Sequence, residues 1–122
     1  FTLSGIHGEG VIEQIDGVIE LDGMVFLVEM KWWHEALGRN DVATHLVSVY
    51  SRGDVGGIYI SASGYTNPAI NDFREALREK VVILCELREI IRLLEQEANL
   101  TELLRSKIRA AKVEKQPYLL AL

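Results

Sequence analysis

The sequence predicts an α/β domain in which a mixed central β-sheet is flanked by helices. Two observations lead to this prediction. An Asp-Gly pair joins two apolar, strand-like runs near the start of the chain, and short β-branched runs then alternate with segments of helical spacing. Such alternation is typical of a sheet with helices on its faces. The 122 residues are enough to enclose one core, so we expect one domain.

A β-hairpin is predicted from the runs 11–21 and 24–33, which Asp22-Gly23 joins. An Asp-Gly pair favours a two-residue type I′ turn, because that turn needs a positive φ at both central positions. The turn also sets the register of the two strands, since the residues that flank it must pair.

Helices and strands then alternate along the chain. Apolar residues at helical spacing follow the hairpin, at Val42, Leu46 and Val49, and Asn40 or Asp41 is expected to cap this helix. The remaining expected elements are a strand over 56–64, a helix over 65–80 capped by Thr66 or Asn67, a strand over 81–87, and helical sequence over 88–115 with a break near Asn99.

The charge and the cysteine content exclude several classes of protein. The net charge of −5 argues against a protein that coats nucleic acid nonspecifically, but it does not exclude local contact with DNA. A single cysteine, Cys85, rules out a disulfide framework within the chain, and we expect it to be a small buried residue. A reducing, cytoplasmic setting is therefore expected. No stretch of the sequence is long and apolar enough to span a membrane.

The predicted hairpin places four polar side chains on one face. In the register that the turn sets, Asp16 lies opposite Glu29, and Gln14 lies opposite Lys31. Because strand side chains alternate between faces, all four point to the same side, at the end of the hairpin away from the turn. Two carboxylates opposite each other repel, so their placement on an apolar face needs a reason beyond folding.

A divalent cation would remove that repulsion, since Mg²⁺ takes carboxylate oxygens as ligands and keeps several waters. A metal beside a lysine and a phosphate is suited to metal-assisted hydrolysis of a phosphodiester, in which Lys31 orients or activates the attacking water. From the spacing alone, an alternative stays open. Lys31 could instead neutralise Asp16 and Glu29 in a purely structural ion-pair cluster.

The stretch GEGVIEQIDGVIELDGMVFLVEMKWW, residues 8–33, resembles the catalytic hairpin of the Mrr-type restriction endonucleases. These enzymes are a branch of the PD-(D/E)xK nuclease superfamily, which also includes Holliday-junction resolvases. The motifs that carry the resemblance are Ile15-Asp16, Asp22-Gly23, Glu29-Met30-Lys31 and Trp32-Trp33. The later segments 55–73 and 81–95 resemble the strands, turn and helices that follow in that family.

The resemblance implies a restriction-endonuclease-like fold and a metal-dependent DNA endonuclease. Asp16, Glu29 and Lys31 would form the catalytic set. Asp16, Glu29 and the backbone carbonyl of Met30 would bind Mg²⁺ or Mn²⁺. Five further residues are candidates for contact with DNA, namely His34, Arg39, Ser63, Tyr65 and Thr66, and for His34 and Arg39 the alternative is a surface position without such a contact.

The resemblance covers roughly residues 5–97. Residues 1–97 are expected to form the nuclease domain, and residues 98–122 a C-terminal helical extension packed on it. The helix with which the family usually begins, often the source of another acid, is missing from this sequence, so we expect further domains of a longer protein. Gln14, Glu13 and Glu9 are the expected auxiliary groups near the site, although the hairpin register points Glu13 to the opposite face.

Two other functions remain open at this stage. The fold could serve as a non-catalytic interaction or dimerisation module that keeps the acids only as an ion-pair cluster. It could also be a junction-resolving nuclease. For an active endonuclease we expect a homodimer, since cutting both strands of a duplex needs two active sites.

Three further expectations concern side chains outside the proposed catalytic set. His45 is expected to be a partly exposed helix histidine. Of Trp32 and Trp33, one is expected in the core, and the other is free to stack on a base or to contact a partner protein. The basic segment 105–115 is expected to be a solvated helix face or, alternatively, a phosphate-facing patch.

Overall fold

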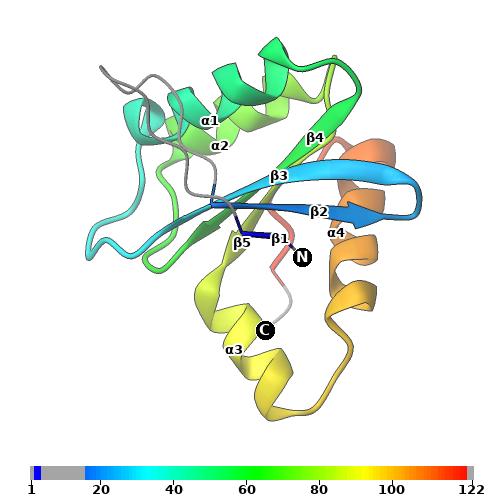
Figure 1. Cartoon of the computed structure of the whole chain (residues 1–122). Helices are drawn as coiled ribbons and strands as arrows, with labels where there is room; N and C mark the ends of the chain where they lie inside the picture. The colour runs from blue at the N-terminus through cyan, green and yellow to red at the C-terminus, as the bar shows by residue number, and fades with distance from the viewer. Residues whose placement is uncertain (1, 4–15, 121–122) are drawn as a thin grey trace.

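A computed structural model of the chain describes residues 2–3 and 16–120. It confirms the α/β fold with a mixed sheet and flanking helices (Figure 1). The five strands lie in the order β1-β2-β3-β4-β5 and are β1 Thr2–Leu3, β2 Gly17–Leu21, β3 Met24–Lys31, β4 Val55–Ser61 and β5 Val82–Glu86. The helices are α1 Arg39–Ser51, α2 Asn67–Ala76, α3 Leu87–Glu95 and α4 Leu100–Glu114.

The β2–β3 hairpin has the predicted turn and register. Asp22 and Gly23 have φ values of 54° and 81°, as a type I′ turn requires. The antiparallel pairing runs from Leu21 opposite Met24 to Gly17 opposite Val28. The first strand described in the hairpin is shorter than the predicted run 11–21, of which residues 11–15 lie outside the described part of the chain.

Strands β3, β4 and β5 are parallel to one another, so their carboxyl ends meet at one edge of the sheet. Lys31 is in register with Ser61, and Ser61 is in register with Glu86. Because β2 is antiparallel to β3, the start of β2 lies at this same edge. The mixed sheet therefore brings together the beginning of one strand and the ends of three others.

Helices cover both faces of the sheet (Figure 1). On one face, α1 and α2 pack over β4, where Tyr59 contacts His45 of α1 and Phe73 of α2. On the other face, Leu100 and Leu104 of α4 line a small cavity of about 80 Å³ with apolar residues of the strands. Cys85 belongs to this second face and is fully buried, as predicted, and burial raises the pKa of its thiol to about 12.

Capping chemistry explains where the helices begin. Thr66 caps α2 as predicted, since its hydroxyl accepts a hydrogen bond from Ala69 N–H. Asn99 marks the predicted break, because its side chain caps α4. The cap of α1 differs from the prediction. Gly38 is the N-cap residue. Asp41, the third residue of the helix, accepts the N–H of Gly38 with its carboxylate at 2.7 Å.

The basic segment 105–115 forms most of α4, and one of its lysines is neither solvated nor directed at a ligand. Lys107 is buried, with its Nζ 3.0 Å from Glu89 Oε2 and donating to the carbonyl of Leu84 at 2.9 Å. The carbonyl of Pro117 then accepts the N–H of Leu84 at 2.8 Å, along the outer edge of β5. These contacts attach α4 and the segment after it to the sheet.

In the described part of the chain, no helix has the length and hydropathy needed to cross a membrane.

Gly57 of β4 allows α1 to approach the sheet closely. A Cβ at this position would lie 2.6 Å from His45 Nε2 and 2.8 Å from a methyl group of Val49. We therefore expect Gly57→Ala to lower the free energy of unfolding by about 1–3 kcal/mol, the usual cost of overpacking. Urea denaturation measures this change. The matched control is Gly53→Ala, where a Cβ meets nothing within 4 Å, and equal stability of the two variants would contradict the prediction.

Candidate active site

Asp16 lies immediately before β2, and its pairing with β3 is irregular. Its N–H donates to the carbonyl of Val28 at 3.0 Å, although Val28 is already the partner of Gly17. Asp16 and Gly17 therefore both lie opposite Val28, as in a β-bulge. The regular register predicted that Asp16 pairs directly opposite Glu29, and the bulge displaces it from that position. The displacement gives the carboxylate a donor, because Asp16 Oδ2 accepts the N–H of Met30 at 2.7 Å. The acid still reaches the Glu29–Met30 segment.

Glu29 is a buried acid in the middle of the sheet, since only 2% of its surface is exposed. Its neighbour on β4 is Tyr59, and Nδ1 of His45 lies 3.6 Å from its Oε1. That oxygen has no hydrogen-bond partner among the described residues. A buried carboxylate oxygen without a hydrogen bond is costly in a folded protein, and only the contact with His45 faces this oxygen among the described residues.

The pKa of Tyr59 is raised by burial and by the acids near it. Burial raises the pKa of its phenol well above the usual range, and the negative charge of Glu29 raises it further, while the hydroxyl donates to the carbonyl of Asp41 at 3.2 Å. Asp41 and Asp16 add to the same rise. Glu29 is in register with Tyr59, so both side chains lie on the face of the sheet that α1 and α2 cover.

Lys31 is the last residue of β3 and is half-buried. Its Nζ lies 5.6 Å from the ring centroid of Trp33, within reach of a cation–π interaction. Its carbonyl accepts the N–H of Ala62 at 3.0 Å, which joins the end of β3 to the end of β4. Lys31 is two residues beyond Glu29 on the same strand, so both side chains point to the same face.

The residues present suit a divalent cation bound by two carboxylates. Glu29 offers an unpartnered oxygen, Asp16 is anchored beside it through Met30 N–H, and Mg²⁺ needs few protein ligands because it keeps several waters. Over residues 2–3 and 16–120, no group of three or more His, Cys, Asp and Glu side chains is close enough to hold a metal ion.

The other predicted site residues are spread around this edge of the sheet. Gln14, Glu13 and Glu9 lie outside the described residues. His34 is exposed in the loop after β3, and Arg39 at the start of α1 is paired with Asp72 at 2.9 Å. Neither therefore joins the Asp16–Glu29–Lys31 group.

The turn after β4 contains the remaining candidates for DNA contact. The hydroxyl of Ser63 donates to the carbonyl of Trp33, so it holds the neighbouring loop. The hydroxyl of Thr66 is used as a helix cap. Tyr65 was expected to contact DNA, but its hydroxyl is used inside the protein. It lies 2.9 Å from the backbone carbonyl of Tyr59 and 2.8 Å from that of Cys85. Its polar group points into the protein.

His45 was expected to be partly exposed, and that expectation is wrong. Only 1% of its surface is exposed, and its ring stacks on Phe73 at a centroid distance of 6.1 Å. The sequence held a signal for this placement, since His45 is three residues after Val42 and four before Val49, and both valines are fully buried. A histidine on the apolar stripe of a helix that covers a sheet must face the sheet.

The expectation that one tryptophan lies in the core is also wrong. Trp32 and Trp33 are 68% and 49% exposed, because β3 ends at Lys31 and the chain leaves the sheet there. Together with His34 and Glu35 they line a shallow groove of about 340 Å³.

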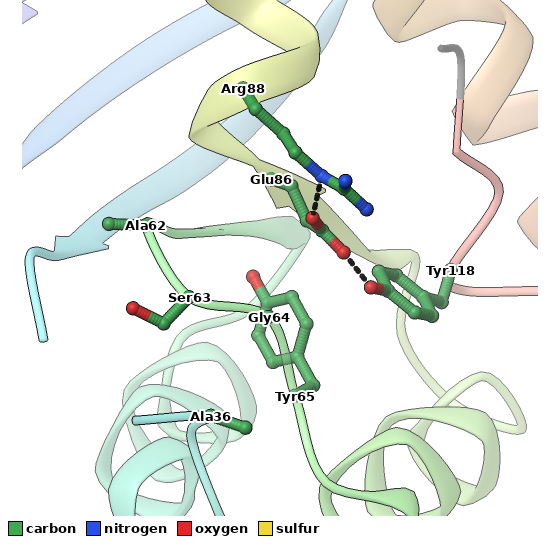
Figure 2. Close-up of a pocket in the computed structure, with 8 residues that line it drawn as sticks. All are labelled: Ala36, Ala62, Ser63, Gly64, Tyr65, Glu86, Arg88 and Tyr118. Atoms are coloured by element: carbon green, nitrogen blue, oxygen red, sulfur yellow. Dashed lines mark hydrogen bonds and ion pairs between the residues drawn. The ribbon is translucent and has the colours of Figure 1, made fainter. Parts of the chain in front are cut away.

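A second pocket, of about 440 Å³, lies at the carboxyl ends of β4 and β5 (Figure 2). Figure 2 shows Glu86 between Arg88 and Tyr118, and Ser63 and Gly64 line the same pocket. Both oxygens of Glu86 are used within the protein. One accepts Arg88 Nε–H at 2.5 Å, and the other accepts the hydroxyl of Tyr118. This acid is therefore satisfied by its neighbours, in contrast to Glu29.

Comparison with known proteins adds one finding. The family model Mrr_cat, which is described as "Restriction endonuclease", matches residues 5–94 of the chain. The matched residues include the hairpin, both parallel crossovers and most of α3. No curated protein and no solved structure matches the chain.

The unpartnered oxygen of Glu29 leads to a test of the site in the metal-free protein. Glu29→Gln keeps the shape of the side chain but removes a buried charge that lies near a second acid. We expect it to raise the free energy of unfolding by about 1 kcal/mol, measured by urea denaturation in EDTA. Glu20→Gln, at an exposed position of β2, is the control and should change stability by less than about 0.5 kcal/mol. A loss of stability in Glu29→Gln would instead favour a structural ion-pair cluster with Lys31.

Proposed function

The chain belongs to the Mrr_cat family of restriction endonucleases and is a nuclease domain, and on this premise we propose that it cuts DNA with the help of a divalent metal ion. The observation that carries the proposal is the unpartnered oxygen of Glu29, buried beside Asp16 and two residues from Lys31. A chain selected only for stability would rarely keep such an acid in its sheet.

Asp16, Glu29 and the carbonyl of Met30 would hold Mg²⁺ or Mn²⁺. The ion would polarise the phosphate and lower the pKa of a bound water. Asp16 would bind the ion from a fixed position, because the hydrogen bond from Met30 N–H holds its carboxylate next to Glu29. Glu29 is held in place by the packing of His45 and Tyr59 around it.

Lys31 would act on the attacking water and on the developing charge of the phosphate. Its position at the end of β3 lets its stem run along the sheet while its ammonium group reaches the open edge. A cation at that edge orients the water and stabilises negative charge as the new bond to phosphorus forms. Because Lys31 lies on the same strand and face as Glu29, with its Nζ near the Trp33 ring, it suits the role of an electrostatic and positioning group.

Cleavage of both strands of a duplex needs two such sites. We therefore propose that the active form is a homodimer, or that further domains of a longer protein supply DNA binding. The net charge of −5 supports the second arrangement, because phosphate contacts provide most of the affinity for DNA and need basic residues.

Asp16→Asn tests the metal site directly. We expect the wild-type protein to bind Mn²⁺ in a calorimetric titration, and Asp16→Asn to lose that binding, because a neutral amide is a much weaker ligand than a carboxylate. Asp72→Asn, which changes an acid paired with Arg39 away from the site, should bind as the wild type does. Binding that is equal in all three proteins would place the ion elsewhere.

Lys31→Ala tests the chemical step. We expect it to keep Mn²⁺ binding and to reduce metal-dependent cleavage of plasmid and linear DNA by at least about 100-fold, because the loss falls on the transition state. The control is Lys112→Ala, an exposed lysine of α4, which should cut like the wild type. If the wild type binds no metal and cuts no DNA, the interaction-module function replaces the one proposed.

A further inference from the structure

We infer that Trp32 and Trp33 form a stacking platform for unpaired nucleobases of DNA, next to the phosphate that is cut. The inference rests on the proposed nuclease function and names the substrate class of that site.

The two tryptophan rings are largely exposed and adjacent in the chain. They are the only two tryptophans of the chain, and 68% and 49% of their surfaces face water. The rings of Phe26, Tyr59 and Phe73, in contrast, are buried almost completely. An exposed pair of large aromatic side chains is typical of a binding surface, because leaving them in water forfeits the free energy of their burial.

The loop that presents these rings is attached at both ends. Ser63 Oγ donates to the carbonyl of Trp33, and Ala62 N–H donates to the carbonyl of Lys31 at 3.0 Å. Leu37 then forms a bridge with the same turn, donating to the carbonyl of Gly64 at 3.0 Å and accepting the N–H of Thr66 at 2.8 Å. The backbone that carries the two rings is therefore held in place before a ligand binds, which reduces the entropy lost on binding.

The distance to the proposed catalytic lysine decides which part of the substrate would stack. Lys31 Nζ lies 5.6 Å from the centroid of the Trp33 ring. That is less than twice the ~3.4 Å that separates successive nucleotides along one DNA strand. A base on Trp33 would thus belong to a nucleotide next to the phosphate that Lys31 contacts.

The chemistry of the groove favours a base over a phosphate. Trp32, Trp33, His34 and Glu35 line it, so it offers π-faces and one acid. A chain with a net charge of −5 gains little from the phosphate backbone, whereas stacking on an aromatic ring is independent of charge and tolerates any base. In a continuous duplex each base already stacks on its neighbours. The expected ligand is therefore DNA with unpaired bases at the cut, as in single strands, flaps or junctions.

Tryptophan fluorescence tests this inference without any cleavage. Since the chain has no other tryptophan, its emission reports the platform alone. In EDTA, we expect a single-stranded oligonucleotide to quench the emission and a blunt duplex of the same sequence to quench it far less. Emission that single-stranded DNA leaves unchanged would overturn the inference. An emission shift that follows protein concentration without DNA would also overturn it, since the rings would then cover a second copy of the chain.

Variants separate stacking from nonspecific binding. By anisotropy of labelled DNA, Trp33→Ala should weaken single-strand binding about tenfold or more and leave duplex binding within about threefold, whereas Trp33→Phe should restore most of the loss. Tyr50→Ala is the matched control, because Tyr50 is an aromatic residue that is 43% exposed at the far end of α1. Equal weakening of both DNA forms by Trp33→Ala would overturn the inference.

The outcomes also separate this inference from the proposed function. Metal-dependent cleavage that needs Asp16 and Lys31, in a protein whose tryptophans do not respond to single strands, overturns the platform and leaves the nuclease standing. Quenching by single strands in a protein that binds no metal and cuts no DNA does the reverse, and it supports the platform as a binding site.

Discussion

The burial of Glu29 is the constraint around which the rest of the site is arranged. The residue lies on the central strand β3, between an antiparallel neighbour and a parallel one. Its face is closed by α1, which approaches closely because Gly57 has no side chain. An acid in such a position, with one oxygen unpartnered among the described residues, lowers stability unless a ligand compensates it. Proteins keep such features where function requires them.

The mixed sheet brings two acids and a lysine to the same end of the strands. Parallel strands gather their carboxyl ends at one edge, where ligands commonly bind in open α/β sheets. That edge holds Glu29 and Lys31 at the end of β3. The antiparallel hairpin then returns the start of β2, with Asp16, to the same edge. A purely parallel sheet would have placed that acid at the opposite end.

The opposite face of the sheet has a different role. There the buried pair of Lys107 and Glu89 joins α4 to α3, and the carbonyl of Leu84 gives the lysine a further partner. A buried ion pair adds little net stability, but removing one partner would leave an uncompensated charge. The pair therefore fixes how the C-terminal helix docks on β5. This attachment lies on the face of the sheet opposite to the one that α1 and α2 cover.

Local chemistry made several features predictable from the sequence alone. The Asp22-Gly23 turn set the hairpin register, since only a few turn types join two strands so tightly. Thr66 and Asn99 marked helix starts because a side-chain oxygen can satisfy a nearby N–H. The face shared by Glu29 and Lys31 followed from the two-residue period of a strand.

Tertiary structure alone decided the features that depend on residues far apart in the chain. The bulge at Asp16 arises where its carboxylate binds Met30 N–H across the hairpin. His45 is buried beside Glu29 because α1 turns one face to the sheet, and Lys107 is buried because α4 packs over Glu89. Both tryptophans are exposed because β3 ends before them. The sequence determined the elements and the pattern of the acids through local rules, whereas burial depends on which surfaces meet, and that is a property of the whole fold.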